Sequence, residues 1–202
     1  MRRLLALVVV SILLIPFFSV EGEEQGPLGW AQSAGGFDDE TLAGHVVLDD
    51  NSIIVAGQYT SSATFGDDGI GATGFEGDTD MFVAKMDASG NWTSIHGFGS
   101  TGSDGIDAIA LHGSGDIILA GHFCLGTAGE SCEMNMGTQT LVKGSDQGEG
   151  DAFVGRFSYN AGQLSIIWIR TISNDNDLSA LDISISPSGG ISVGIFHRDI
   201  IE

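Results

Sequence analysis

The sequence predicts an all-β fold made of four-stranded antiparallel units that repeat along the chain. The segment Asp80–Trp92 reads Asp-Met-Phe-Val-Ala-Lys-Met-Asp-Ala-Ser-Gly-Asn-Trp, and a close copy, Asp-Ala-Phe-Val-Gly-Arg-Phe, begins at Asp151. The 202 residues include 31 glycines and only 3 prolines, which is typical of many short strands joined by tight turns. A hydrophobic content of 42% is too high for a disordered chain.

The start of the chain has the pattern of a secretory signal peptide. Two arginines precede an apolar run from Leu4 to Val20, and small or polar residues follow it. A retained membrane anchor is the alternative, because the run approaches the length of a spanning helix. Pro16, late in the run, favours cleavage. We therefore expect a signal peptide at residues 1–22, a linker at 23–29, and a secreted or cell-surface protein without stable membrane insertion after cleavage.

The charge of the chain restricts its partners. It has 27 acidic residues against 7 lysines and arginines, which gives a formal net charge of −20. Such a surface repels nucleic-acid phosphates and anionic membranes, so no nucleic-acid partner is expected. It attracts cations, and a solvated acidic coat of an extracellular protein is the favoured interpretation.

A series of strands is expected, separated by turns rich in Gly, Asp and Asn. The expected strands are Leu42–Leu48, Ile53–Tyr59, Asp80–Asp87, Ile106–Leu111, Ile117–Phe123 and Ile191–His197. In the third of these both faces are largely apolar, which indicates a strand with neighbouring sheets on both sides. Gly90 in the turn that follows suits a positive φ angle.

Two cysteines lie in a longer connection of the second unit. Ile117–Phe123 matches Ile53–Tyr59 nearly residue for residue, but the stretch that follows it is longer and contains Cys124 and Cys132. In an exported chain this isolated pair predicts a disulfide, worth about 2–3 kcal/mol. A zinc site would need further ligands, and only His122 is adjacent.

The tryptophans divide the predicted repeat array, residues 30–202, into units. Trp30, Trp92 and Trp168 give repeats 30–91 and 92–167 and an incomplete repeat 168–202. Four strands per repeat with aromatic markers are typical of β-propeller blades, so the expected fold is a partial β-propeller of about two and a half blades. Because a closed propeller needs more blades, the chain is expected to be a fragment of a longer protein. Association of copies and an open stack are the alternatives.

These segments also resemble a known family of repeats. The segments are Trp-Ala-Gln-Ser-Ala-Gly-Gly at Trp30, Ile-Ile-Val-Ala-Gly-Gln-Tyr at Ile53, Ala-Thr-Phe-Gly at Ala63, and Asp80–Trp92. They resemble β-propeller repeats of the SBBP type, which occur in secreted and cell-surface proteins of bacteria and archaea. The resemblance extends from Trp30 to about His197. It implies a propeller fold and an extracellular location.

No catalytic constellation is recognisable, since the histidines are dispersed and none lies in a nucleophile-bearing motif. Acidic clusters alternating with glycine could bind calcium, although none has EF-hand spacing, and solvated turns are the favoured interpretation. The clusters are Gly66–Gly69, Asp78–Asp80, Asp104–Asp107, Glu149–Asp151 and Asn174–Asp177. No other cofactor is expected. Asn91 begins an Asn-Trp-Thr glycosylation sequon.

Three functions remain open on the sequence alone. The first is a non-enzymatic extracellular binding or scaffold module that contacts protein or glycan. The second is an extracellular propeller enzyme, a polysaccharide hydrolase or lyase, whose site is completed by missing blades. The third is a calcium-dependent structural protein of the cell envelope. Whichever function holds, the isolated chain is expected to be marginally stable or to self-associate, because an open stack leaves strand edges unpaired.

Overall fold

The prediction of an all-β fold is confirmed. The computed structural model describes residues 30–36, 38–66, 70–73, 78–113, 115–144, 150–173 and 177–198. Every helix or strand within these residues is a β-strand, and the sheets are antiparallel. The predicted signal peptide and linker lie outside this part of the chain. The same residues contain no helix long and apolar enough to cross a membrane.

Two four-stranded sheets share one connectivity. The first sheet has the order β2 (Glu40–Val47), β3 (Ile53–Tyr59), β6 (Asp80–Met86) and β7 (Trp92–Phe98). The second has the order β8 (Ser103–Leu111), β9 (Ile117–Leu125), β12 (Asp151–Asn160) and β13 (Gln163–Ile172). A third sheet consists of β14 (Asp177–Ile185) and β15 (Ile191–Arg198). Each large sheet is a meander, interrupted once between its second and third strands.

The interruptions are small hairpins. In the first sheet, β4 (Ser62–Phe65) and β5 (Ile70–Thr73) follow β3, and β1 (Ala34–Gly35) pairs with β4. In the second sheet, β10 (Glu133–Met136) and β11 (Gln139–Val142) follow β9. The two hairpins therefore lie at corresponding places in the two meanders.

The β2–β3, β8–β9 and β14–β15 hairpins have the same kind of turn. The N–H groups of Asn51, Gly115 and Gly189 donate to the carbonyl three residues earlier. These residues have φ angles of 60°, 84° and 83°, in the left-handed region that glycine and asparagine tolerate. Gly90, in the turn between β6 and β7, has φ 87°, as the sequence predicts. Local turn chemistry thus sets these hairpins.

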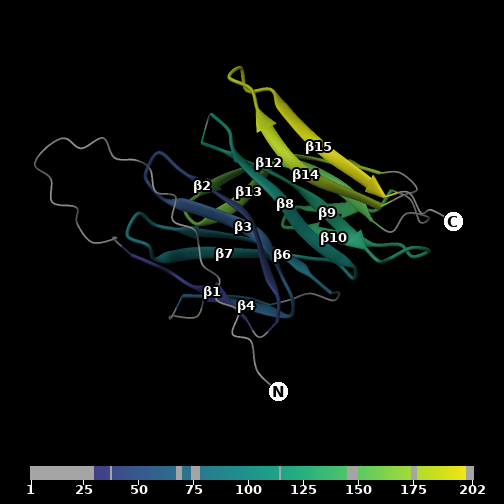
Figure 1. The fold of residues 1–202 in the computed structure, drawn as a ribbon, viewed down its shortest axis with the longest axis horizontal. Helices are drawn as coiled ribbons and strands as arrows, with labels where there is room; N and C mark the ends of the chain where they lie inside the picture. The colour runs from purple at the N-terminus through teal and green to yellow at the C-terminus, as the bar shows by residue number, and fades with distance from the viewer. Residues whose placement is uncertain are drawn as a thin grey trace, which may run out of the picture.

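The sheets stack in chain order (Figure 1). Met81 and Val83 of β6 face the larger core between the first two sheets, while Phe82 and Ala84 belong to a second core on the opposite face. The expectation that this strand has packing on both faces is confirmed. The second sheet is also covered on both faces, since β14 contacts β8, β9 and β12. The outer face of the first sheet is covered by the β1–β4–β5 sheet, where Phe65 is 2% exposed.

Trp92 and Trp168 do not occupy equivalent places in the pairing of the last two strands of each large sheet. Met86 pairs with Trp92 in the first sheet, and the corresponding Phe157 pairs with Ile166 in the second. Trp168 lies two residues further on, opposite Arg156 and inside β13. The sheets themselves begin one strand after the first two tryptophans, at Glu40 and Ser103.

Asp104 joins the first two sheets. Its backbone N–H donates to the Thr79 carbonyl at 2.8 Å, and its buried carboxylate accepts from the N–H groups of Ser100 at 2.6 Å and Cys124 at 2.9 Å. Burial raises the pKa of Asp104 to about 6, and the charge of Asp80 adds to the rise, while these hydrogen bonds oppose it.

This raised pKa predicts a pH dependence of stability. Because the Asp104 pKa is higher in the folded than in the unfolded chain, its contribution to stability is full below about pH 4 and is lost as pH rises through about 6. The difference in unfolding free energy between the wild type and Asp104→Asn should fall between about pH 4 and about pH 6 and stay level at higher pH. Urea unfolding at a series of pH values measures this, with exposed Asp49→Asn as the control. A difference that rises with pH would contradict the assignment.

Candidate binding groove

A polar groove lies where two turns of the first sheet meet one turn of the second sheet. It has a volume of about 500 Å³. The β2–β3 turn, strand β6, the β6–β7 turn, strand β7 and the β12–β13 turn contribute its walls. We call it the Lys85 groove, and its lining residues are Asp50, Ser52, Lys85, Asp87, Ala88, Thr93, Ala161 and Gly162.

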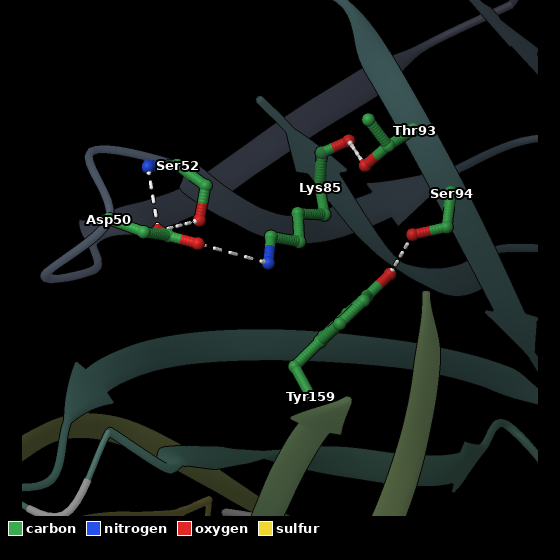
Figure 2. A network of polar contacts seen from close by, with 6 residues as sticks. All are labelled: Asp50, Ser52, Lys85, Thr93, Ser94 and Tyr159. Carbon is green, nitrogen blue, oxygen red and sulfur yellow. Dashed lines mark hydrogen bonds and ion pairs between the residues drawn. The ribbon is translucent and has the colours of Figure 1, made fainter. Parts of the chain in front are cut away.

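Lys85 is the cation of this groove (Figure 2). Its Nζ lies 3.9 Å from Asp50 Oδ2 and 5.5 Å from the centroid of the Tyr159 ring. The ammonium group therefore lies between a carboxylate and an aromatic face. Its side chain is 19% exposed, so the group remains accessible from the groove.

Tyr159 and His96 fix the second sheet against the first. The Tyr159 hydroxyl shares a hydrogen bond with Ser94 of β7, which Figure 2 shows beside Lys85. His96 Nε2 donates to the Gly162 carbonyl at 3.0 Å, and its ring lies edge-on to Tyr159 with centroids 5.6 Å apart. Burial raises the pKa of Tyr159, so its hydroxyl stays neutral. These contacts hold the β12–β13 turn at the rim of the groove.

The two carboxylates of the groove are held in the ionised form. Hydrogen bonds from the Ser52 side chain and backbone lower the pKa of Asp50. Hydrogen bonds from Asn91 lower the pKa of Asp87, with its Nδ2 donating at 3.0 Å and its N–H at 2.9 Å. A glycosidase needs one carboxylic acid with a raised pKa as proton donor, and these two groups have the opposite shift.

The groove thus presents two carboxylates, one ammonium group and the side chains of Ser52 and Thr93. Carboxylates accept hydrogen bonds from hydroxyl groups, and an ammonium group donates up to three. A ligand that carries many hydroxyl groups can satisfy both kinds of partner at once. The arrangement is suited to binding such a ligand and holding its orientation.

A second groove lies between β7 and the β10–β11 turn. Its volume is about 370 Å³, and strand β13 forms its third side. Met136 and Phe157 form its buried part, with exposed fractions of 1% and 0%. We call it the β7–β10 groove, and its lining residues are His96, Phe98, Met136, Gly137, Thr138, Phe157, Gln163, Leu164, Ser165 and Ile166.

The structure contains the disulfide that the sequence predicts. Cys124 and Cys132 are bonded, with Cα atoms 5.9 Å apart. With both sulfurs in this bond, neither is free to ligate zinc. The loop is also held by Lys143, whose Nζ donates to Thr127 Oγ1 at 2.9 Å and whose N–H donates to the Cys132 carbonyl at 3.0 Å. The bridge therefore ties the end of β9 to the β10–β11 hairpin.

Asn91, the predicted glycosylation site, is exposed in the β6–β7 turn. Its Nδ2 donates to Asp87, and the hydroxyl of Thr93 donates to the Lys85 carbonyl at 3.1 Å. The sequon therefore lies beside the Lys85 groove. Glycosylation itself stays a prediction.

Two of the acidic clusters lie close together, since the N–H of Asp104 donates to the Thr79 carbonyl and the charge of Asp80 raises the Asp104 pKa. Asp104 binds Ser100 and Cys124, whereas Asp107 Oδ2 accepts from His122 Nδ1 at 3.0 Å. Asp151 Oδ2 accepts from the N–H of Gly144 at 2.6 Å, so it binds the segment that precedes its strand. Among the residues with described placement, no three His, Cys, Asp or Glu side chains form a group that could hold a metal ion. Residues 67–69, 145–149 and 174–176 lie outside that set, and calcium binding stays an untested prediction.

The residues of the Lys85 groove were not singled out by the sequence reasoning, although one signal points to them. Lys85 is the one side chain of β6 that is not fully buried. The second sheet places Arg156 at the matching position, since Ile54 pairs with Lys85 and Ile118 with Arg156. Arg156 Nε donates to Asp116 at 2.7 Å. The sequence signal that points to this groove is therefore a basic residue at the same position of the third strand in both large sheets.

Comparison with models of known protein families gives no match, and comparison with curated proteins gives no significant relative.

Proposed function

We propose that this chain is a non-enzymatic, secreted or cell-surface binding module of β-propeller type, and that it binds a glycan in the Lys85 groove. The observation that carries the proposal is that Lys85 lines one groove together with two carboxylates of lowered pKa, Asp50, with which it pairs, and Asp87. These groups bind hydroxyl-rich ligands but lack the proton donor that glycoside cleavage needs.

The architecture supports the propeller part of the proposal. Both large sheets are four-stranded antiparallel meanders, as propeller blades are. Their first strands lie next to each other, since β2 contacts β8 and β8 contacts β14. In a propeller the first strand of each blade lines the central axis, so this stacking is the one expected of consecutive blades. The third sheet would then be the first half of a further blade.

The disulfide and the charge support the location and the ligand class. Disulfides persist mainly in oxidising compartments, which fits export of the chain. The net charge of −20 disfavours nucleic acids and acidic polymers as ligands. Neutral glycans avoid that repulsion, and their hydroxyl groups match both the carboxylates and the ammonium group of the groove.

Binding to a panel of immobilised neutral oligosaccharides tests the proposal. The wild type should bind at least one of them, and Lys85→Met should weaken that binding about tenfold or more, or about 1.4 kcal/mol, because the ammonium donor is lost while the aliphatic stem remains. Arg170→Met, which removes a positive charge from the exposed part of β13, is the matched control and should bind as the wild type does. No binding to any neutral glycan, or equal binding by Lys85→Met, would refute the proposal.

A further inference from the structure

The ion pair of the Lys85 groove is too long to be a hydrogen bond. Lys85 Nζ lies 3.9 Å from Asp50 Oδ2, beyond the usual N–H···O length. Figure 2 shows the ammonium group between this carboxylate and the Tyr159 ring. Within the described part of the chain, Lys85 Nζ makes no hydrogen bond. Its N–H donors can therefore bind a ligand that enters the groove.

Asp50 presents its second carboxylate oxygen to the same place. Its Oδ1 accepts hydrogen bonds from the N–H of Ser52, at 3.0 Å, and from the Ser52 hydroxyl. Oδ2 is the oxygen on the side of Lys85. The Asp50 side chain is 65% exposed, so a ligand can reach this oxygen. An ionised carboxylate only accepts hydrogen bonds, which makes Oδ2 an acceptor next to the Lys85 donor.

The other carboxylate of the groove is engaged by its own turn. Asp87 Oδ1 accepts from the N–H groups of Ser89 and Asn91, both at 2.9 Å. Asp87 Oδ2 accepts from Asn91 Nδ2 at 3.0 Å. Asp87 therefore holds the β6–β7 turn, and Asp50 is the carboxylate better placed to bind a ligand together with Lys85.

The spacing of Asp50 Oδ2 and Lys85 Nζ suits two neighbouring hydroxyl groups. Hydroxyl groups on adjacent ring carbons of a sugar are staggered, and in the gauche arrangement their oxygens can face two protein atoms side by side. One hydroxyl can then donate to Asp50 while its neighbour accepts from Lys85. A single hydroxyl shared by two atoms 3.9 Å apart would donate and accept at close to a right angle, narrower than its tetrahedral geometry.

We propose that Asp50 and Lys85 recognise a vicinal diol of one sugar ring, with one hydroxyl donating to Asp50 Oδ2 and the adjacent hydroxyl accepting from Lys85 Nζ. This inference rests on the proposed glycan-binding function and specifies which part of the glycan the groove reads. The ligand class is neutral glycans with a free gauche pair of ring hydroxyls. A sugar unit that is linked or O-methylated at either hydroxyl does not fit.

Deoxy sugars test the proposal on the intact protein. The probes are the methyl pyranosides of glucose, galactose and mannose, each also as its 3-deoxy and its 6-deoxy derivative. Both derivatives lack one hydroxyl, but only the 3-deoxy sugar loses every vicinal pair of ring hydroxyls. For each parent that binds, NMR titration should give a 3-deoxy derivative at least about tenfold weaker than the 6-deoxy derivative.

Three variants locate the diol on the protein. Asp50→Asn keeps an oxygen that can accept from Ser52, so the β2–β3 turn should be retained, but it loses the carboxylate beside Lys85. Asp50→Asn and Lys85→Met should each reduce the preference for the 6-deoxy over the 3-deoxy sugar to less than about threefold. Asp49→Asn, at an exposed acid of the same turn that does not line the groove, is the control and should keep the full preference.

The outcomes separate this inference from the proposed function. Equal binding of the 3-deoxy and 6-deoxy sugars would overturn the diol assignment and leave glycan binding in place. A preference that Asp50→Asn leaves unchanged would put the diol elsewhere and overturn it as well. No binding of any methyl pyranoside or neutral oligosaccharide would refute glycan binding itself, and the diol assignment with it.

Discussion

Replacing Gly121 with alanine is expected to destabilise the protein by about 2–4 kcal/mol, because the new methyl group has no space. A Cβ atom at this position of β9 would lie 2.0 Å from the Gly105 carbonyl oxygen and 2.9 Å from Phe153 Cε1. The closest neighbour is backbone of the adjacent strand β8, so relief requires β8 to move and not only a side chain. Register shifts of the β8–β9 pairing lie on both sides of this place, between Ser103 and Gly105 and between Ile106 and Ala108.

Urea unfolding of matched variants measures the effect. Gly57 is the counterpart in the first sheet, where a Cβ would lie 2.1 Å from the Thr41 carbonyl oxygen, and Gly57→Ala should lose a similar free energy. Gly113, in the β8–β9 turn, has no heavy atom within 4 Å of its Cβ position, so Gly113→Ala should stay within about 0.5 kcal/mol of the wild type. If Gly121→Ala were as stable as Gly113→Ala, the β8–β9 packing described above would be wrong.

Removing the disulfide is expected to cost about 2–3 kcal/mol, from the chain entropy released in a loop with a sequence separation of 8. The double variant Cys124→Ala/Cys132→Ala should show this loss in urea unfolding. Cys124 also has a φ angle of 61°, which glycine adopts without strain. The variant Cys124→Gly/Cys132→Ala should therefore recover about 1 kcal/mol of the loss.

Reduction of the wild type gives an independent measurement of the same quantity. The reduced protein should lose a free energy close to that of the alanine double variant. A stability unchanged by reduction would contradict the role assigned to this bridge, and a glycine variant less stable than the alanine variant would contradict the backbone conformation at Cys124.

Much of the strand arrangement could be predicted from local patterns. The β-branched run Ile53–Tyr59 corresponds to β3 in full, and Asp80–Met86 forms β6 with apolar side chains on both faces. Turn residues fixed the hairpin ends, because positive φ angles favour Gly and Asn. The β10–β11 hairpin was not predicted, since its four-residue strands lie in a connection whose composition resembles a loop.

The place of Trp168 and the residues of the grooves could not be derived in this way. Sequence spacing treats Trp168 as equivalent to Trp92, but the longer β12–β13 hairpin shifts the ladder, and Trp168 falls inside a strand. Ser94 and Tyr159, which join the sheets beside Lys85, are 65 residues apart. Their contact depends on how one sheet packs on the next, which no local pattern contains.

Chemical-shift mapping by NMR with the glycan that the screen selects is the most direct measurement of the central claim. The proposal expects the largest perturbations at Lys85, Thr93 and Gly162, with little change at Gly137 and Ile166 in the other groove. The same titration with Lys85→Met should need about ten times more glycan for equal shifts. Perturbations that avoid the Lys85 groove, or a wild-type spectrum unchanged by every neutral glycan, would contradict the account.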